Sequence, residues 1–96
     1  MVDVDASGRV AVSYYDFRND RPGDARLSTD FWITHSDDGG RSFTDESRLT
    51  PTSFDMHFVG DYTGLDHVGT VFRPAWVAAN DGNLVNPTDV FTRSAG

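Results

Sequence analysis

The chain has no cysteine, no lysine, a single glutamate and no long hydrophobic run. Without cysteine it can form no disulfide, and it has no thiolate to act as a nucleophile or zinc ligand. No stretch approaches the roughly 18 consecutive apolar residues that a membrane-spanning helix requires. The opening MVDVDASGRV lacks a basic segment followed by an apolar core, so no signal peptide is expected. What is left is a chain of 96 residues, enough for one domain at most.

Acidic residues outnumber basic residues in the chain. Fifteen acids stand against eight arginines, which gives a formal net charge of −7, and every acid except Glu46 is an aspartate. Binding to nucleic acid or to an anionic membrane requires a basic surface, so neither is expected as a partner. Aspartate and glycine favour turns, whereas the helix formers glutamate and lysine are nearly absent. The composition therefore predicts many turns and few helices.

Segments that alternate between polar and apolar residues dominate the chain. GRVAVSYYDF, DFWITHS and GTVFRPAWV are rich in β-branched and aromatic residues, which favour strands. DASG, SDDGG, RNDRPGD and NDGN lie between such segments and are typical of turns. We predict strands near residues 2–5, 9–17, 29–36, 44–50, 57–65, 69–78 and 88–93.

The order of these segments repeats within the chain. Val10 and Val71 stand 61 positions apart, and the same offset holds for several neighbouring residues until a slightly shorter loop intervenes. The matched pairs are Val4 with Leu65, Gly8 with Gly69, Val10 with Val71, Tyr15 with Trp76, and Trp32 with Phe91. Each copy is a strand, a tight turn, a long strand that ends in an aromatic residue, a polar loop and a third aromatic strand.

A repeat of several dozen residues with four strands is typical of a propeller blade. We expect residues 1–54 to form one complete blade and residues 55–96 to form a second, incomplete one. A single blade cannot bury both of its faces, and known propellers arrange about four to eight blades around an axis. Unpaired N–H and C=O groups on outer strands also invite edge pairing. The chain is therefore expected to be a fragment, or to associate with copies of itself through its open blade edges.

The segment HSDDGGRSF, residues 35–43, places Ser36, Asp38, Gly40 and Ser42 at every second position, with Phe43 following. In a turn the aspartate can accept backbone N–H groups, the second glycine permits a positive φ, and the aromatic ring can pack under the loop. The spacing resembles the Asp-box of sialidases and related propellers, Ser-x-Asp-x-Gly-x-Thr-Trp. The resemblance implies a structural turn on the side away from the active site. Contact with carbohydrate or calcium, and a catalytic role, stay open as alternatives.

The resemblance extends over roughly residues 2 to 93. GRVAVSYYDFRND and FVGDYTGLDHVGTVFRPAW look like the last blades of sialidase-like and BNR-repeat glycoside hydrolases. This implies an all-β, six-bladed propeller of antiparallel blades, with the missing last strand supplied by the N-terminus of the whole protein. It also implies a glycoside hydrolase that acts on a sialoside-like carbohydrate, in which this chain is mainly scaffold and is inactive alone. The alternative is a non-catalytic BNR-repeat propeller that binds glycans or proteins.

Sialidases use a tyrosine nucleophile with a carboxylate base, and arginines that bind the substrate carboxylate. The resemblance places Tyr62 at the nucleophile position, with Asp61 and Arg18 at the rim of the channel; simple packing of Tyr62 is the alternative. Glu46 follows the Asp-box and is expected on the wrong side to serve as its base. Arg18 shares a strand face with Asp16. It either binds a carboxylate ligand or pairs with a neighbouring aspartate.

No metal or cofactor is expected. Asp3, Asp5 and Ser7 have the spacing of a calcium loop, but Tyr14 stands where that loop requires a glutamate, so a plain hairpin is predicted. The histidines occur singly and fit no metal-binding motif: His35, His57 and His67. The compartment stays unknown, although the resemblance is compatible with export.

Overall fold

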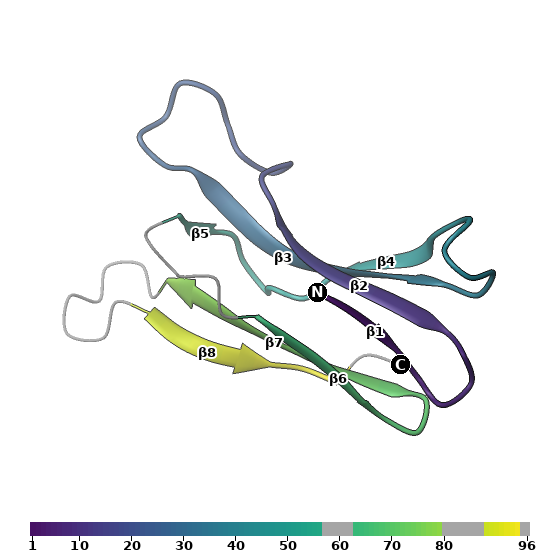
Figure 1. The fold of residues 1–96 in the computed structure, drawn as a ribbon. Helices are drawn as coiled ribbons and strands as arrows, with labels where there is room; N and C mark the ends of the chain where they lie inside the picture. The colour runs from purple at the N-terminus through teal and green to yellow at the C-terminus, as the bar shows by residue number, and fades with distance from the viewer. Residues whose placement is uncertain (57–62, 80–87, 95–96) are drawn as a thin grey trace.

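The computed structural model of the chain describes residues 1–56, 63–79 and 88–94. Within these ranges the fold is all-β, as expected, and consists of two antiparallel sheets that pack face to face, with no helix (Figure 1). The first sheet contains β1 (Val2–Val4), β2 (Val10–Asp16), β3 (Ser28–Ser36), β4 (Thr44–Arg48) and the short β5 (Phe54–Asp55). The second contains β6 (Gly64–Val68), β7 (Val71–Ala79) and β8 (Thr88–Thr92).

Both sheets are meanders in which neighbouring strands are also neighbours in the sequence. The first runs β1-β2-β3-β4, with β5 paired to the start of β3, and the second runs β6-β7-β8. Most predicted strands are confirmed to within about two residues. The prediction for 57–65 is wrong in its extent, because the strand runs on to Val68, and β5 was not predicted. Residues 57–62 lie outside the described part of the chain.

The β1–β2 connection is a hairpin turn, as predicted. Asp5 closes it: its Oδ1 accepts hydrogen bonds from the Ser7 backbone N at 2.8 Å, the Ser7 Oγ at 2.6 Å and the Arg9 backbone N at 3.0 Å. Gly8 has a φ of 89°, a conformation that a residue with a Cβ rarely adopts. The acidic spacing therefore serves local backbone hydrogen bonding.

Strand pairing shows where the internal repeat holds and where it shifts. Tyr15 lies opposite Phe31 and Trp76 lies opposite Phe91, so the counterpart of Phe91 is Phe31 and not Trp32 as predicted. Val4 pairs with Val10 across five intervening residues, whereas Val68 pairs with Val71 across two. The counterpart of Val4 is thus Val68 rather than Leu65, because the second turn is three residues shorter.

The core lies between the two sheets. Phe31 of the first sheet stacks on Trp76 of the second, with ring centroids 5.1 Å apart, and Tyr15 meets Phe31 edge-on at 4.9 Å. The Tyr15 hydroxyl donates to the Val77 carbonyl at 2.6 Å and accepts from the Val77 backbone N at 3.1 Å. The buried hydrophobic residues are Ala11, Phe31, Ile33, Leu49, Phe54, Phe72, Trp76 and Ala78. Because each buried aromatic contributes about 1.5–3 kcal/mol, these contacts hold the sheets together.

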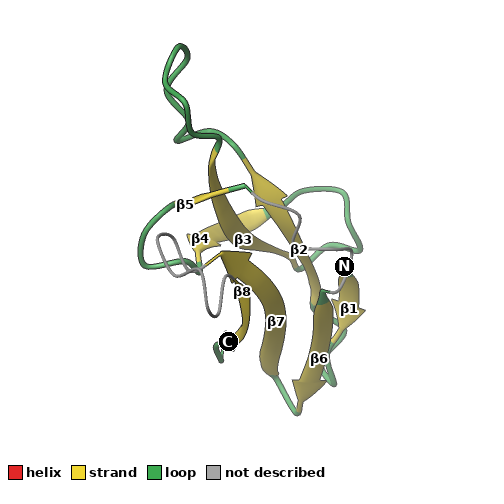
Figure 2. Ribbon diagram, turned by 90° about the vertical axis from the view of Figure 1, so that its left-hand side faces the viewer, coloured by secondary structure: helices red, strands yellow, loops and turns green. Residues whose placement is uncertain are grey.

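The first strands of the two sheets, β1 and β6, lie beside each other (Figures 1 and 2). The turns that follow them are joined by a hydrogen bond from the Ala6 backbone N to the Gly69 carbonyl at 3.0 Å. All five residues of β4 are exposed, at the far end of the first sheet. In the described part of the second sheet no strand occupies the matching place beside β8.

Candidate functional site

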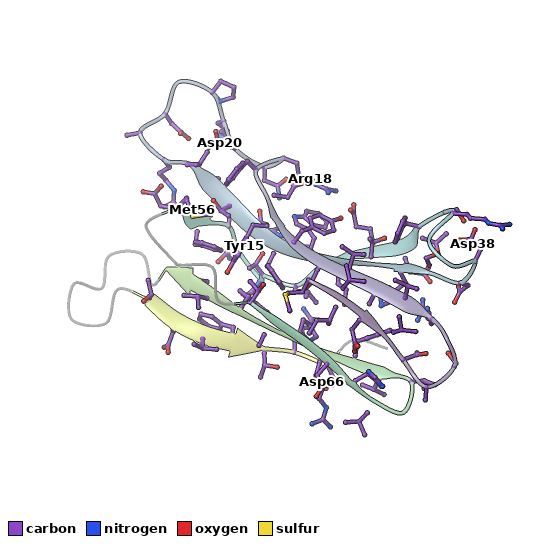
Figure 3. All side chains as sticks on the ribbon, viewed as in Figure 1. Tyr15, Arg18, Asp20, Asp38, Met56 and Asp66 are labelled. Carbon is purple, nitrogen blue, oxygen red and sulfur yellow. The ribbon has the colours of Figure 1, made fainter. Side chains whose placement is uncertain are left out.

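The Asp-box segment forms a turn that is closed by its own side chains, between β3 and β4. Asp38 Oδ1 accepts a hydrogen bond from the Ser42 backbone N at 2.9 Å, and Asp38 Oδ2 accepts one from the Ser42 Oγ at 2.5 Å. The Ser36 Oγ donates to Asp38 at 2.8 Å and accepts from the Gly40 backbone N at 2.9 Å. Gly40 has a φ of 93°. The predicted use of Asp38 and Gly40 is confirmed, and Figure 3 shows Asp38 within this loop.

Phe43 does not form the apolar plug that was predicted. Its side chain is 47 % exposed and does not belong to the buried core. The loop before β4 extends past the second sheet (Figure 1). The turn is therefore held by polar contacts around Asp38, which lower the pKa of that carboxyl to about 2, first through the Ser42 side chain.

The outer face of the first sheet, which points away from the second sheet, carries a cluster of polar and aromatic side chains. Arg18 Nη1 donates to Glu46 at 2.5 Å, and its Nη2 donates to Glu46 at 3.1 Å and to Asp16 at 3.0 Å. The guanidinium carbon lies 3.9 Å from the centre of the Trp32 ring, and the Tyr14 hydroxyl donates to Glu46. We call these five residues the outer-face cluster. Figure 3 shows Arg18 on this side of the sheet.

The cluster combines a tyrosine, a glutamate and an arginine, but its electrostatics do not favour nucleophilic attack. Burial, followed by the hydrogen bond to Glu46, raises the pKa of Tyr14 to about 12, so the phenol keeps its proton. The hydrogen bond from Arg18 lowers the pKa of Glu46, which makes that carboxylate a weaker base. Glu46 and then Asp16 raise the pKa of Arg18 and occupy both terminal nitrogens. Arg18 was expected either to bind a carboxylate ligand or to pair with a neighbouring aspartate. In the structure it pairs with Asp16, and also with Glu46.

Two of the predicted site residues, Asp61 and Tyr62, lie outside the described residues. Of the three residues predicted for the channel rim, the structure therefore describes only Arg18. Sequence analysis missed the contact of Glu46 with Tyr14. Alternation along β2 puts Tyr14 and Asp16 on one face, but the position of Glu46 depends on a register shift between β3 and β4, near Asp45 with its φ of 55°.

A second polar group surrounds Asp30, whose side chain is fully buried. Its Oδ1 accepts hydrogen bonds from Arg48 Nε at 2.8 Å and Thr50 Oγ1 at 2.5 Å, and its Oδ2 accepts from Ser53 Oγ at 2.7 Å and Asn19 Nδ2 at 2.9 Å. Burial alone would raise the pKa of Asp30, but these hydrogen bonds outweigh it and lower the pKa. Both oxygens of Asp30 accept two hydrogen bonds each, so the residue suits a structural role.

A third group joins β1 to β6. His67 Nδ1 lies 2.7 Å from Asp3 Oδ2, and with Asp66 these residues offer three possible metal-ligand atoms within 4.8 Å of one another. The hydrogen bond to Asp3 raises the pKa of His67, as in an ordinary ion pair. This pairing accounts for the closeness of the three side chains. The sequence gives no signal for this pairing, because Asp3 and His67 are 64 positions apart.

No family model, curated protein or solved structure matches the chain. Nowhere in the described ranges is there a helix whose length and apolar character would let it cross a membrane.

Proposed function

We propose that the chain forms two adjacent blades of a sialidase-like β-propeller, with residues 1–54 in the first blade and residues 55–96 in the second. The observation that carries the proposal is the tandem arrangement of two antiparallel meanders, packed face to face with β1 beside β6 (Figure 2). The cross-strand aromatic pairs Tyr15–Phe31 and Trp76–Phe91 occupy matching positions in the two meanders. Propellers stack successive sheets around an axis in this way.

The Asp-box turn gives further support. It stands between the third and fourth strands of the first sheet, which is the position that the resemblance implies. Asp38, Ser36 and Ser42 form a closed set of hydrogen bonds with the loop backbone, and this suits a structural turn rather than a binding loop.

In this proposal the chain is mainly scaffold of a glycoside hydrolase that acts on a sialoside-like carbohydrate, and it is inactive alone. The outer-face cluster supports the inactivity, because Arg18 is bound by Glu46 and Asp16 and the Tyr14 phenol stays protonated. Asp61 and Tyr62 remain the proposed contribution to the channel rim. The remaining acid, base and arginines would come from other blades.

The second candidate is a non-catalytic propeller that binds glycans or proteins. The same cluster favours it: the Arg18 guanidinium carbon lies 3.9 Å from the centre of the Trp32 ring, beside Tyr14, and this arrangement offers an aromatic and polar surface without a reactive group.

The experiment compares the isolated chain with the product of the longest open reading frame that contains it, each incubated with a fluorogenic sialoside. We expect turnover by the longer product and none by the chain. Turnover by the chain that is lost in Tyr62→Phe would overturn the assignment as inactive scaffold. A longer product that binds sialosides without cleaving them would support the second candidate. If the reading frame encodes only these residues and its product is a stable monomer by light scattering, the propeller proposal is contradicted.

A further inference from the structure

The strands β1 and β6 bring together one histidine and two aspartates. His67 Nδ1 lies 2.7 Å from Asp3 Oδ2, and Asp66 completes a set of three possible ligand atoms that all lie within 4.8 Å of one another. The Asp66 carboxylate is held in position, because its Oδ1 accepts a hydrogen bond from the His67 backbone N at 2.8 Å. We call Asp3, Asp66 and His67 the β1–β6 cluster, and Figure 3 shows Asp66 on β6.

The charges in and beside this cluster do not balance. Asp5 follows directly after β1, is 6 % exposed, and stays ionised because the hydrogen bond from the Ser7 hydroxyl lowers its pKa. Within the described ranges, no arginine makes an ion pair with Asp3, Asp5 or Asp66. Three carboxylates and one protonated histidine leave a net charge of −2, since −3 and +1 sum to −2. Buried charges in proteins are paired or coordinate metal ions, so this excess favours a further divalent cation.

A second feature that points to a cation is the free oxygen of Asp5. Its Oδ1 accepts the hydrogen bonds of the β1–β2 turn, but its Oδ2 is buried and has no partner among the described residues. The neighbouring Ala6 backbone N bonds to the Gly69 carbonyl at 3.0 Å, so this turn lies against the end of β6. The hydrogen bond to Asp3 raises the pKa of His67, and the charge of Asp5 adds to the effect. Asp5 therefore acts on the same ring from behind the cluster, as a closed-off negative charge and not as a ligand.

The ligand types and their spacing select the metal. An imidazole with carboxylates suits zinc and similar transition metals, whereas magnesium and calcium prefer oxygen ligands alone. Ligand atoms in a tetrahedral zinc site lie about 3.3 Å apart. Small rotations of Asp3 and His67, whose side chains are 21 % and 32 % exposed, reach this spacing. We propose that the β1–β6 cluster binds Zn²⁺ through one oxygen each of Asp3 and Asp66 and a ring nitrogen of His67, with water in the fourth position. The ion thereby clips the first sheet to the second.

The test is a calorimetric titration of the chain, freed of metal by a chelator, with zinc chloride. We expect one site per chain and a Kd of about 1–100 μM at neutral pH, weaker than a closed structural zinc site. In NMR spectra of the same sample the His67 ring signals should shift, and those of His35, which is 2 % exposed, should not. Mg²⁺ and Ca²⁺ should bind at least about tenfold more weakly. At ten times the Kd, Zn²⁺ should raise the melting temperature by about 5 °C.

Variants tie the binding to the cluster. His67→Gln and Asp66→Asn each remove a ligand and should weaken Zn²⁺ binding by about tenfold or more, since the loss of a supporting group alone has an effect of this size. Asp66 is exposed, so Asp66→Asn keeps the test valid if His67→Gln, which also breaks the pair with Asp3, does not fold. Asp5→Asn removes only the charge behind the site and should weaken binding less. Asp24→Asn, the same change of charge in an exposed loop, should leave the affinity unchanged.

Three results would overturn the proposal. They are the absence of saturation by Zn²⁺ in the micromolar range, binding of Ca²⁺ as tight as that of Zn²⁺, and an equal loss of affinity in Asp24→Asn and Asp66→Asn. None of these depends on whether the chain belongs to a glycoside hydrolase.

Discussion

Asp38 and Asp30 are both ionised carboxylates that hold loops in place, but one is exposed and the other is buried. Asp38 bonds to Ser36 and Ser42, which are two and four positions away from it, so its contacts form within a single turn. Asp30 joins the loop after β2 to the end of β4 and to the segment before β5. A substitution of Asp38 should therefore destabilise a single turn, whereas a substitution of Asp30 should destabilise the contacts between several segments.

Asp38→Asn should lower the melting temperature at neutral pH, because an amide accepts the Ser42 and Ser36 hydrogen bonds less well. The pKa of Asp38 in the folded chain is about 2, below its ordinary value of 3.8, so its ionised form favours folding. That stabilisation is complete above about pH 4 and is lost as the pH falls from about 4 to 2. The melting temperatures of the two proteins, followed by circular dichroism, should converge over this window. Asp37→Asn, at an exposed neighbour, is the control; a constant difference from pH 7 to 2 would contradict the prediction.

Asp30→Ala should reduce the free energy of unfolding by about 3–5 kcal/mol, since it leaves Arg48 and three polar neighbours without their common partner. Urea unfolding measures the change. Asp24→Ala, in an exposed loop, should stay within about 0.5 kcal/mol of the wild type. If Asp30→Ala does not fold, Asp30→Asn, which keeps one acceptor, gives the same comparison with a smaller loss. A loss equal to that of Asp24→Ala would show that the buried network is not needed.

Among the strands, the hairpin between β6 and β7 depends on one glycine. Gly69 has a φ of 60°, in the left-handed region, whereas Gly64 of β6 has no positive φ and an added Cβ there would lie 3.8 Å from the Ala75 Cβ. Gly69→Ala should cost about 1–2 kcal/mol of stability through backbone strain. Gly64→Ala should be neutral or stabilising, by up to about 1 kcal/mol. Thermal unfolding of the pair measures this, and the reverse order would disprove the assigned turn.

The strands were predictable where alternation is strong and the turns are rich in glycine and aspartate, as in β2 and β3. The prediction was wrong at β6, because Asp66 and His67 interrupt the apolar pattern and pairing with β7 holds them in the strand. β5 has only two residues and exists through its pairing with β3, so no local pattern reveals it.

The candidate sites were likewise predictable where their contacts are local in the sequence and not where the contacts are distant. In the turn around Asp38, the backbone hydrogen bonding of Asp38 and the positive φ of Gly40 were predictable, since they depend on residues close in sequence, whereas the exposure of Phe43 was not. The contact between Tyr14 and Glu46 spans 32 positions and needs both the β2–β3 register and the shifted β3–β4 register. Long-range registers of this kind are fixed by tertiary contacts and not by spacing in the sequence.

Within the described residues, each sheet buries one face, and the outer strands β4 and β8 are largely exposed. Val90 on β8 is 70 % exposed, at the edge where the first sheet has its fourth strand. We expect the isolated chain to associate through this edge, because unpaired backbone groups and an apolar side chain favour strand addition. Light scattering coupled to size-exclusion chromatography should show species larger than a monomer.

Val90→Lys should shift this distribution towards the monomer, since an edge lysine opposes strand pairing. Val2→Lys is the matched control: Val2 is 64 % exposed, but it lies on β1, beside β6. A clean trimer would fit three copies forming a closed ring of six blades. A strictly monomeric wild type at high concentration would contradict the expectation.

The two tryptophans lie on opposite sides of the first sheet. Trp76 is 3 % exposed and stacks on Phe31 in the layer between the sheets, whereas Trp32 lies beneath Arg18 on the outside. Each indole is thus a built-in optical probe of a different event. With Trp32→Phe, the remaining emission reports whether the two sheets separate. With Trp76→Phe, the emission of Trp32 reports whether another surface covers the outer face of the first sheet.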